Sequence, residues 1–136
     1  MNQDTNQPVW VIGAGLAGCE AAWTLAQQGV AVRLYEMKPQ QYTPAHQYKG
    51  FAELICSNSL KAARIGSAAG MLKEEMRILG SLTMEAAQQT SVSAGGALAV
   101  DRERFSDFIT ERILAHPLIE VVEARINYLA YAPEIA

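Results

Sequence analysis

The residue with the clearest capacity for chemistry is Cys56, a nucleophile type that opens the polar stretch of residues 56–59. This stretch lies twenty residues beyond Glu36, the acidic end of a glycine-rich motif. A cysteine becomes reactive when neighbouring donors and cations favour its thiolate, and the adjacent hydroxyl and amide side chains, with Lys61 and Arg64, supply both. Local chemistry alone leaves a reactive thiol and an inert thiol both open.

A glycine fingerprint for dinucleotide binding precedes this cysteine. Gly13 permits a tight turn out of a strand, Gly15 lets the backbone approach a pyrophosphate, and Gly18 allows the following helix to pack closely. The amides at the start of that helix favour phosphates, and the Glu36 carboxylate favours a ribose hydroxyl while disfavouring the 2′-phosphate of NADP. The candidate cofactor-binding residues are Gly13, Ala14, Gly15, Leu16, Ala17, Gly18 and Glu36.

The fingerprint leaves the ligand open, because FAD and NAD use the same residues and a glycine-rich turn can also lack a ligand. Cys19 follows the fingerprint inside the helix, where a small apolar thiol suits packing. His46 and His116 are isolated, and Glu20 is a helix-face acid with no further indication of function. Neither cysteine belongs to a spaced set of metal ligands, so we expect no metal site.

Strands and helices at both ends of the chain predict how these residues are held. Apolar residues 9–12, a helix over residues 16–26 that stops at Gly29, and an alternating strand over residues 30–35 form a right-handed βαβ unit. Residues 118–122 predict a third parallel strand. The fold class is therefore α/β, a Rossmann-like domain with a parallel sheet.

The middle of the chain gives weaker signals. Residues 37–50 read as a loop, and residues 51–80 read as helical with breaks near residues 57–59 and 66–67. Further along we expect a short helix over residues 82–89, a strand over residues 97–100, and an amphipathic helix capped by Asp101 and ended by Pro117. The last ten residues, 127–136, have no clear assignment.

Length and composition limit the class of protein. The chain has 136 residues, 50% hydrophobic and 18% charged, which indicates one globular domain. It has neither an apolar run long enough to span a membrane nor a signal peptide, so we expect a cytoplasmic protein without a membrane partner. The net charge is −3, although residues 38–80 carry six basic against three acidic side chains. This local excess is too modest to predict nucleic-acid binding by itself.

Five blocks in order closely resemble one family, the TrmFO enzymes, which are folate- and FAD-dependent tRNA (uracil-5-)-methyltransferases. The blocks are residues 13–22, 34–39, 56–60, 72–77 and 94–102. The resemblance implies a doubly wound FAD domain, and it selects FAD over NAD. It also implies a cytosolic enzyme that methylates C5 of the T-loop uridine in tRNA, with 5,10-methylenetetrahydrofolate as the carbon source and NAD(P)H as a further cofactor.

Cys56 matches the first of two cysteines that this family uses. Uracil C5 is a poor nucleophile until a thiolate adds to C6, and the methylene group delivered by the folate must afterwards be reduced by the flavin. The resemblance thus makes Cys56 the catalytic candidate. It leaves two roles open, namely attack on uracil, or handling of a proton or flavin adduct.

The resemblance ends near Val122, and the chain contains neither the second cysteine nor the second domain of the family. We expect residues 1–136 to be the N-terminal FAD-binding part, incomplete relative to the family, with an unassigned tail from about residue 123. Alone, this part is expected to be inactive. Two alternatives remain: a non-catalytic FAD- or nucleotide-binding module, and the related flavin-dependent family that modifies tRNA uridine with carboxymethylaminomethyl groups. The sequence of residues 56–59 and Glu36 favour TrmFO over that relative.

Overall fold

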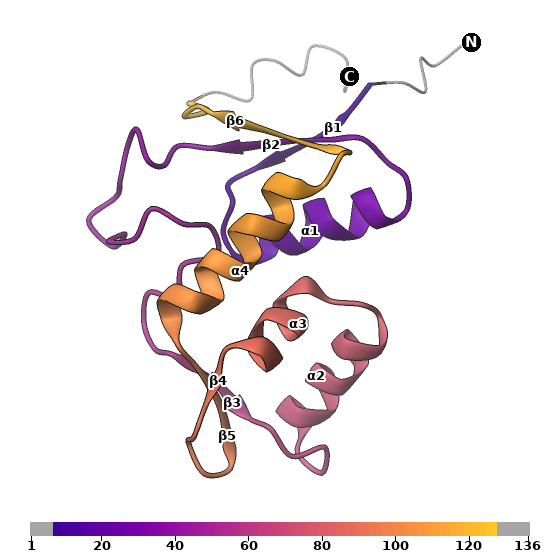
Figure 1. Ribbon diagram of the computed structural model, residues 1–136, viewed down its shortest axis with the longest axis vertical. Coiled ribbons are helices and arrows are strands. Elements are labelled where there is room, and N and C mark those ends of the chain that lie inside the picture. Colours follow the sequence, from indigo (N-terminus) through magenta and orange to yellow (C-terminus); the bar gives the residue numbers. More distant parts are fainter. Residues whose placement is uncertain (1–6, 128–136) are drawn as a thin grey trace.

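A parallel three-stranded sheet forms one end of the molecule. The structure, a computed structural model of the chain, describes residues 7–127. The strands are β1 (Val9–Ile12), β2 (Val32–Glu36) and β6 (Ile119–Glu123), and they lie side by side in the order β1-β2-β6 (Figure 1). All pairs are parallel. The α/β class, the parallel sheet and the third strand near residues 118–122 are thereby confirmed.

Two helices pack on the same face of this sheet, as Figure 1 shows. Helix α1 (Leu16–Gln27) ends where Gly29 takes a φ of 80°, which permits the reversal of the chain into β2. Helix α4 (Arg102–Ala115) begins at Asp101, whose carboxylate accepts a hydrogen bond from the amide of Arg104 at 3.0 Å. Both boundaries follow the sequence prediction closely.

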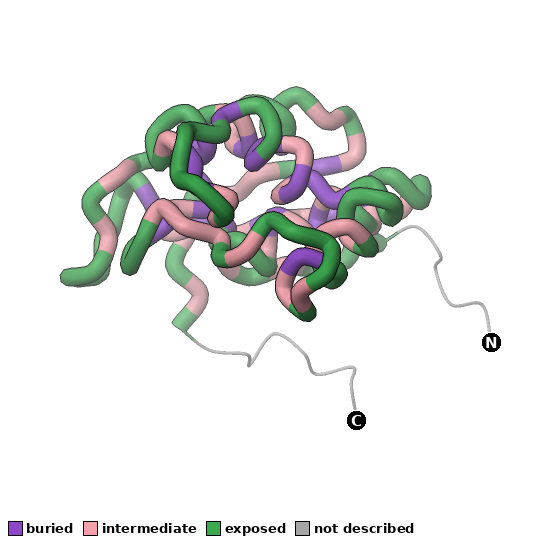
Figure 2. Tube along the Cα trace, turned by 90° about the horizontal axis from the view of Figure 1, so that it is seen from below, coloured by how far each residue is buried: buried purple, intermediate pink, exposed green. Residues whose placement is uncertain are grey.

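The core lies between this sheet and these helices. Because side chains alternate along a strand, Val32 and Leu34 of β2 point toward the helices and are almost wholly buried. Burying each such side chain stabilises the fold by about 1.5–3 kcal/mol. The buried colour in Figure 2 is concentrated inside the described chain, and the largest fully buried side chains of α4 are Phe105, Ile109 and Ile113.

A second, antiparallel sheet lies at the N-terminal end of α4, whereas the parallel sheet lies at its C-terminal end. The sequence did not predict this second sheet. Strands β3 (Ser59–Ala62), β5 (Ala97–Val100) and β4 (Ser91–Val92) lie in the order β3-β5-β4. The predicted strand over residues 97–100 is confirmed. The helical reading of residues 51–62 is wrong, because this stretch bonds to distant parts of the chain instead of to itself.

The remaining helices complete this smaller end. Helix α2 (Ala68–Ile78) begins at Ser67, whose hydroxyl accepts from the amide of Gly70 at 3.1 Å. Helix α3 (Leu82–Gln89) begins at Ser81 in the same way and confirms the predicted short helix. None of the helices in residues 7–127 has the length and apolar character needed to cross a membrane.

Glu20 of α1 has a structural role that the sequence did not reveal. Its carboxylate accepts hydrogen bonds from the amides of Leu82 and Thr83 at 3.1 and 2.9 Å, and from the Thr83 hydroxyl at 2.6 Å. A carboxylate at the N-terminus of a helix satisfies amides that lack partners within the helix. Glu20 therefore joins α1 to the first turn of α3.

Candidate nucleotide and thiol site

The glycine turn, residues 13–18, connects β1 to α1. Gly13 has a φ of 92° and its amide donates to the carbonyl of Tyr35 at 2.7 Å. A Cβ on Gly18 would lie 1.8 Å from the Gly13 carbonyl oxygen, whereas a Cβ on Gly15 would meet no atom within 4 Å. Thus Gly18 closes the turn against the strand, and the backbone at Gly15 is open to an approaching ligand.

The start of α1 has the character of an anion site. Its N-cap residue is Gly15, and no side chain caps the helix. The first amides of a helix have no partners within it, and they carry the positive end of the helix dipole. The residues Leu16 and Ala17 present these amides, and both are exposed. The geometry can therefore accept a phosphate without displacing a side chain.

Glu36 lies at the end of β2 and directly supports the turn. One carboxylate oxygen accepts from the amide of Ala14 at 2.7 Å, and the other accepts from the amide of Lys38 at 2.9 Å. The side chain is buried. Since a carboxylate can accept about four hydrogen bonds, it keeps capacity for a ribose hydroxyl. The sequence predicted only the ribose contact, and the structural contact to Ala14 is additional.

A groove with a volume of about 290 Å³ runs past the turn. Gly13, Gly15 and Glu36 line it, so the structure brings three predicted cofactor-binding residues to one surface. Its other walls were not foreseen, because they come from residues distant in sequence. These additional lining residues include His46 and, after β6, the segment 124–126. The amide of Ala124 donates to the Glu36 carbonyl at 2.8 Å, which sets that segment beside the turn.

The cysteine segment, residues 50–58, packs against the glycine turn. The amide of Ala52 donates to the carbonyl of Ala14 at 2.8 Å. On its other side, α4 holds the segment: Phe51 donates its amide to Thr110 Oγ1 at 2.8 Å and accepts at its carbonyl from Ser106 Oγ at 2.5 Å. Ala52 has a φ of 49°, which is not helical. These contacts explain why the helical prediction failed here.

Cys56 lies in the exposed part of this segment. It follows Ala52 by four residues, so its Cα is at most about 14 Å from that of Ala52. Its polar neighbours hold the backbone: the Ser57 hydroxyl accepts from the amide of Ser59, and Asn58 Nδ2 donates to the Val100 carbonyl at 3.1 Å. The segment is thus fixed at both ends while the thiol remains accessible.

Whereas Cys56 is exposed, Cys19 is buried. It is 1% exposed and its thiol donates to the Ala14 carbonyl at 3.4 Å. Burial, reinforced by the negative charge of Glu36, raises the pKa of Cys19 from 9.0 to about 12. A thiol that stays protonated is unreactive. The packing role predicted for Cys19 agrees with this environment.

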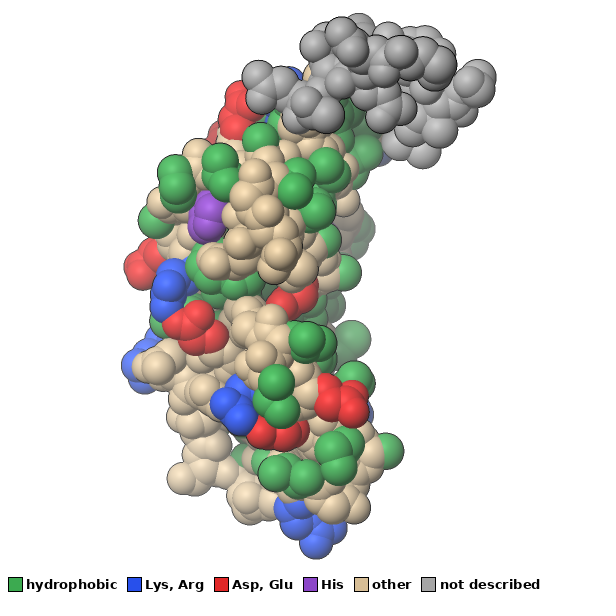
Figure 3. Space-filling view, turned by 90° about the vertical axis from the view of Figure 1, so that its right-hand side faces the viewer, with side chains coloured by type: hydrophobic (Ala, Val, Ile, Leu, Met, Phe, Trp, Pro, Cys, Tyr) green, Lys and Arg blue, Asp and Glu red, His purple; other side chains and the backbone are tan. Residues whose placement is uncertain are grey.

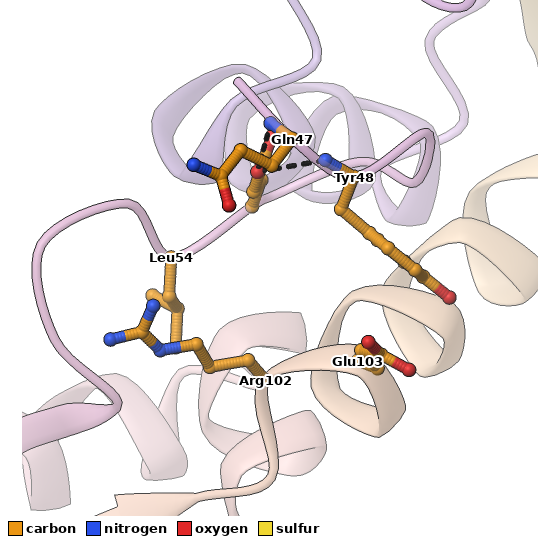
Figure 4. Close-up of a pocket in the computed structure, with 6 residues that line it drawn as sticks. Gln47, Tyr48, Leu54, Arg102 and Glu103 are labelled. Carbon is orange, nitrogen blue, oxygen red and sulfur yellow. Dashed lines mark hydrogen bonds between the residues drawn. The ribbon is translucent and has the colours of Figure 1, made fainter. Parts of the chain in front are cut away.

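A pocket of about 280 Å³ adjoins the cysteine segment (Figure 4). Gln47 and Tyr48 line one wall, and Arg102 and Glu103, at the start of α4, line the other. Tyr48 donates its hydroxyl to Asp107 at 2.7 Å, and this hydrogen bond raises the pKa of Tyr48 to about 12. Arg102 and Glu103 also line a neighbouring open pocket with Asn58, so both pockets border the cysteine segment.

Charge on the described surface is mixed. In the face shown in Figure 3, basic and acidic side chains lie among apolar ones and form no continuous basic area. Within residues 7–127, no group of three or more His, Cys, Asp or Glu side chains could hold a metal ion. The candidate site consists of the groove at the glycine turn and the exposed thiol of Cys56.

A family model described as glucose inhibited division protein A matches residues 8–135. The chain belongs to this family. The matched residues of this chain include the glycine turn, Glu36 and Cys56. The match thus covers both parts of the candidate site.

Curated relatives share much higher identity with this chain than the fold alone would require. A protein of Geotalea daltonii is 61% identical over 117 residues, and one of Ligilactobacillus salivarius is also 61% identical over 117 residues. Each alignment covers 86% of this chain and 27% of the relative. Both relatives are named methylenetetrahydrofolate–tRNA-(uracil-5-)-methyltransferase TrmFO. The chain therefore spans about a quarter of the length of these relatives.

Solved structures confirm the fold. The GidA protein of Aquifex aeolicus superimposes with a TM-score of 0.67 at 18% identity, covering 90% of this chain and 20% of that one. The p-nitrophenol 4-monooxygenase PnpA of Pseudomonas putida gives a TM-score of 0.55 at 14% identity, covering 88% and 32%. At such identities the likeness concerns the fold alone, and it agrees with the Rossmann-like architecture.

Proposed function

We propose that this chain forms the FAD-binding N-terminal part of a folate-dependent tRNA (uracil-5-)-methyltransferase. In this proposal the glycine turn binds the pyrophosphate, Glu36 binds the adenosine ribose, and Cys56 lies at the catalytic face. The observation that carries it is the hydrogen bond between Ala52 and Ala14, which fastens the exposed cysteine segment to the glycine turn. The TrmFO names of relatives that are 61% identical support the same function.

The residues at the turn fit a dinucleotide. The amides at the start of α1 are uncapped, Gly15 leaves space for close approach, and Glu36 borders the same groove. FAD, when bound, would supply the reducing equivalents that convert a transferred methylene group into a methyl group. The chain's own residues supply binding and orientation: backbone amides neutralise phosphate charge, and Glu36 fixes the position of the ribose.

Cys56 is the residue that we assign to chemistry on the uracil. A thiolate that adds to C6 turns C5 into a nucleophile, and the exposed thiol is accessible to a base of a large substrate. Proton handling beside the cofactor is the other role that an exposed thiol at this place supports. The contacts of Asn58 to β5 and of Ala52 to Ala14 would keep the thiol at a constant distance from the turn.

The proposal includes the partners and reductant that such an activity requires. The substrates would be tRNA and 5,10-methylenetetrahydrofolate, and NAD(P)H would reduce the cofactor. This chemistry takes place where tRNA is modified, so we place the protein in the cytoplasm. We expect no metal to take part in the reaction.

FAD binding by the purified chain tests the proposal, and Glu36→Gln is the informative variant. Titration followed by flavin fluorescence should show saturable binding to the wild type, weakened roughly tenfold in Glu36→Gln, because one charged acceptor is lost. Glu123→Gln is the matched control, since Glu123 pairs with Glu36 in the sheet but is exposed. It should bind FAD like the wild type.

The role of Cys56 is tested with tRNA that carries 5-fluorouridine in the T-loop. Addition of the thiolate to C6 breaks the C5–C6 double bond, and the C5 carbanion takes the methylene group of added 5,10-methylenetetrahydrofolate; fluorine in place of the C5 proton then prevents the elimination that would release the thiolate. With FAD and 5,10-methylenetetrahydrofolate supplied, mass spectrometry should detect this single-turnover adduct in the wild type and not in Cys56→Ala, although the chain alone is not expected to complete the reaction. FAD binding with no adduct would favour a non-catalytic nucleotide-binding module, and absence of FAD binding would contradict the proposal as a whole.

A further inference from the structure

Lys38 is a buried cation for which the proposed function has no use. It is 3% exposed, and its ammonium donates to the carbonyls of Tyr48 at 3.1 Å and Gly50 at 2.6 Å, and to Glu53 Oε2 at 3.3 Å. An ammonium has three N–H donors, and here all three have acceptors. No donor is left for a ligand, so Lys38 acts on the structure around it.

Glu53 completes this arrangement inside the cysteine segment. Its Oε1 accepts from the amides of Gln47 and Tyr48 at 2.8 and 2.9 Å, which are the dashed lines in Figure 4. Burial acts to raise the pKa of Glu53, but these amides and the Lys38 ammonium lower it below its ordinary value. Glu53 is therefore an anion at neutral pH, and it pairs with Lys38 where both are largely withdrawn from water.

The backbone of Lys38 reaches the glycine turn. Its amide donates to one oxygen of Glu36, and the other oxygen of Glu36 accepts from the amide of Ala14. The carbonyl of Ala14 accepts in turn from the amide of Ala52. The contacts thus close a ring that runs from the turn through Glu36 and Lys38 into the cysteine segment and back to the turn.

We propose that Lys38 is a positioning residue that couples nucleotide binding at the glycine turn to the reactivity of the Cys56 thiol. This inference rests on the proposed function, because it requires a nucleotide at the turn. A ligand that contacts Glu36 and the turn amides would tighten the ring, and Lys38 would transmit that change to the segment that carries Cys56. Coupling of equilibria is reciprocal, so a nucleotide that shifts the state of the cysteine segment must itself bind with a changed affinity once Cys56 is modified.

The two cysteines make this coupling measurable. Because Cys19 is buried and its pKa is raised to about 12, an aromatic disulfide reagent near neutral pH reacts with Cys56 alone. ADP is the suitable ligand, since it carries the adenosine and pyrophosphate of FAD and has no flavin ring to shield the thiol. We expect saturating ADP to change the labelling rate of wild-type Cys56 roughly fivefold.

Lys38→Met should reduce this ADP effect to less than about twofold while ADP still binds. The matched control is Lys73→Met, because Lys73 also donates its ammonium to two carbonyls, those of Ala62 and Ala69, but lies outside the ring. It should keep the wild-type effect. If circular dichroism shows that Lys38→Met does not fold, Glu53→Gln replaces it: glutamine can still accept from the two amides, and the loss of charge should at least halve the ADP effect.

The outcomes separate the inference from the function beneath it. An ADP effect of equal size in wild type and Lys38→Met would mean direct shielding and would overturn the inference. If ADP binds but the labelling rate of wild-type Cys56 does not change, the inference about Lys38 is overturned as well. In either case the proposed function still stands as long as the chain binds FAD. Failure of the wild type to bind either FAD or ADP would overturn both. A change in ADP affinity after Cys56 is labelled, present in the wild type and lost in Lys38→Met, would support the coupling.

Discussion

The glycine turn and the cysteine segment touch each other, but different kinds of contact hold them in place. The turn lies within one βαβ unit, where Gly13 bonds to Tyr35 and Gly18 packs on Gly13. The cysteine segment bonds to Lys38, to Ser106 and Thr110 of α4, and to β5. A turn made by near neighbours can be read from its own residues, whereas a segment made by distant partners cannot.

The largest effect should come from Gly18→Ala, which tests how rigid the turn is. A Cβ at this position would lie 1.8 Å from the Gly13 carbonyl oxygen, so β1 and α1 must separate. We expect a loss of about 3 kcal/mol in the free energy of unfolding, and loss of FAD binding. Chemical denaturation measures the former. Gly96→Ala, where a Cβ would meet no atom within 4 Å, is the matched control, and an equal cost there would refute the explanation.

Ser106→Ala should have a smaller effect, confined to the cysteine segment. Ser106 is 1% exposed, and its loss would leave the Phe51 carbonyl without this donor. We expect a cost of about 2 kcal/mol, with faster hydrogen exchange at the Ala52 amide than at the amides of β2. The exposed Ser91→Ala should cost less than about 0.5 kcal/mol. If hydrogen exchange became equally faster at the Ala52 amide and at the amides of β2, the effect of Ser106→Ala would not be confined to the cysteine segment.

Alkaline pH should destabilise the turn region through Cys19. The unfolded thiol loses its proton above its ordinary pKa of 9.0, whereas the folded thiol keeps it until about 12. The folded state then binds more protons, so stability falls as pH rises through this window, by at most about 1.4 kcal/mol per pH unit. Urea unfolding between about pH 8 and about pH 10.5 measures the slope. Cys19→Ala should remove this contribution, and an unchanged slope would contradict it.

Cys56→Ser should have the smallest effect on stability. The thiol is exposed, so we expect a change of less than about 0.5 kcal/mol in the free energy of unfolding. Labelling by the disulfide reagent should nevertheless disappear. A large loss of stability would mean that the thiol supports the segment, contrary to the assignment of the supporting contacts to Ala52, Phe51 and Asn58.

Sequence patterns recovered the elements whose contacts are local or periodic. The βαβ unit, the Asp101 cap and the strand near residues 118–122 follow from glycine placement, capping and apolar runs. Strand β3 was missed because four residues with no apolar alternation form it only through pairing with β5. A long-range partner overrode the local helical preference.

The sequence contains a signal for the burial of Lys38. Buried side chains alternate along Val32, Leu34 and Glu36, and Lys38 occupies the next inward position. A cation in such a position requires buried acceptors, because an unpaired buried charge is costly. The sequence could therefore predict that Lys38 has partners. It could not identify Tyr48, Gly50 and Glu53 as those partners.

The sequence by itself determined the Rossmann-like class, the glycine turn and the candidate residues, because backbone freedom at glycine and side-chain alternation are local properties. The resemblance to TrmFO also came from the sequence alone, because it rests on the order of short blocks of residues along the chain. Only the tertiary structure decided that Glu36 supports Ala14, that Lys38 closes a ring with the cysteine segment, and that Cys56 is exposed. Those features depend on contacts between residues far apart in the chain, which folding brings together and local patterns do not specify.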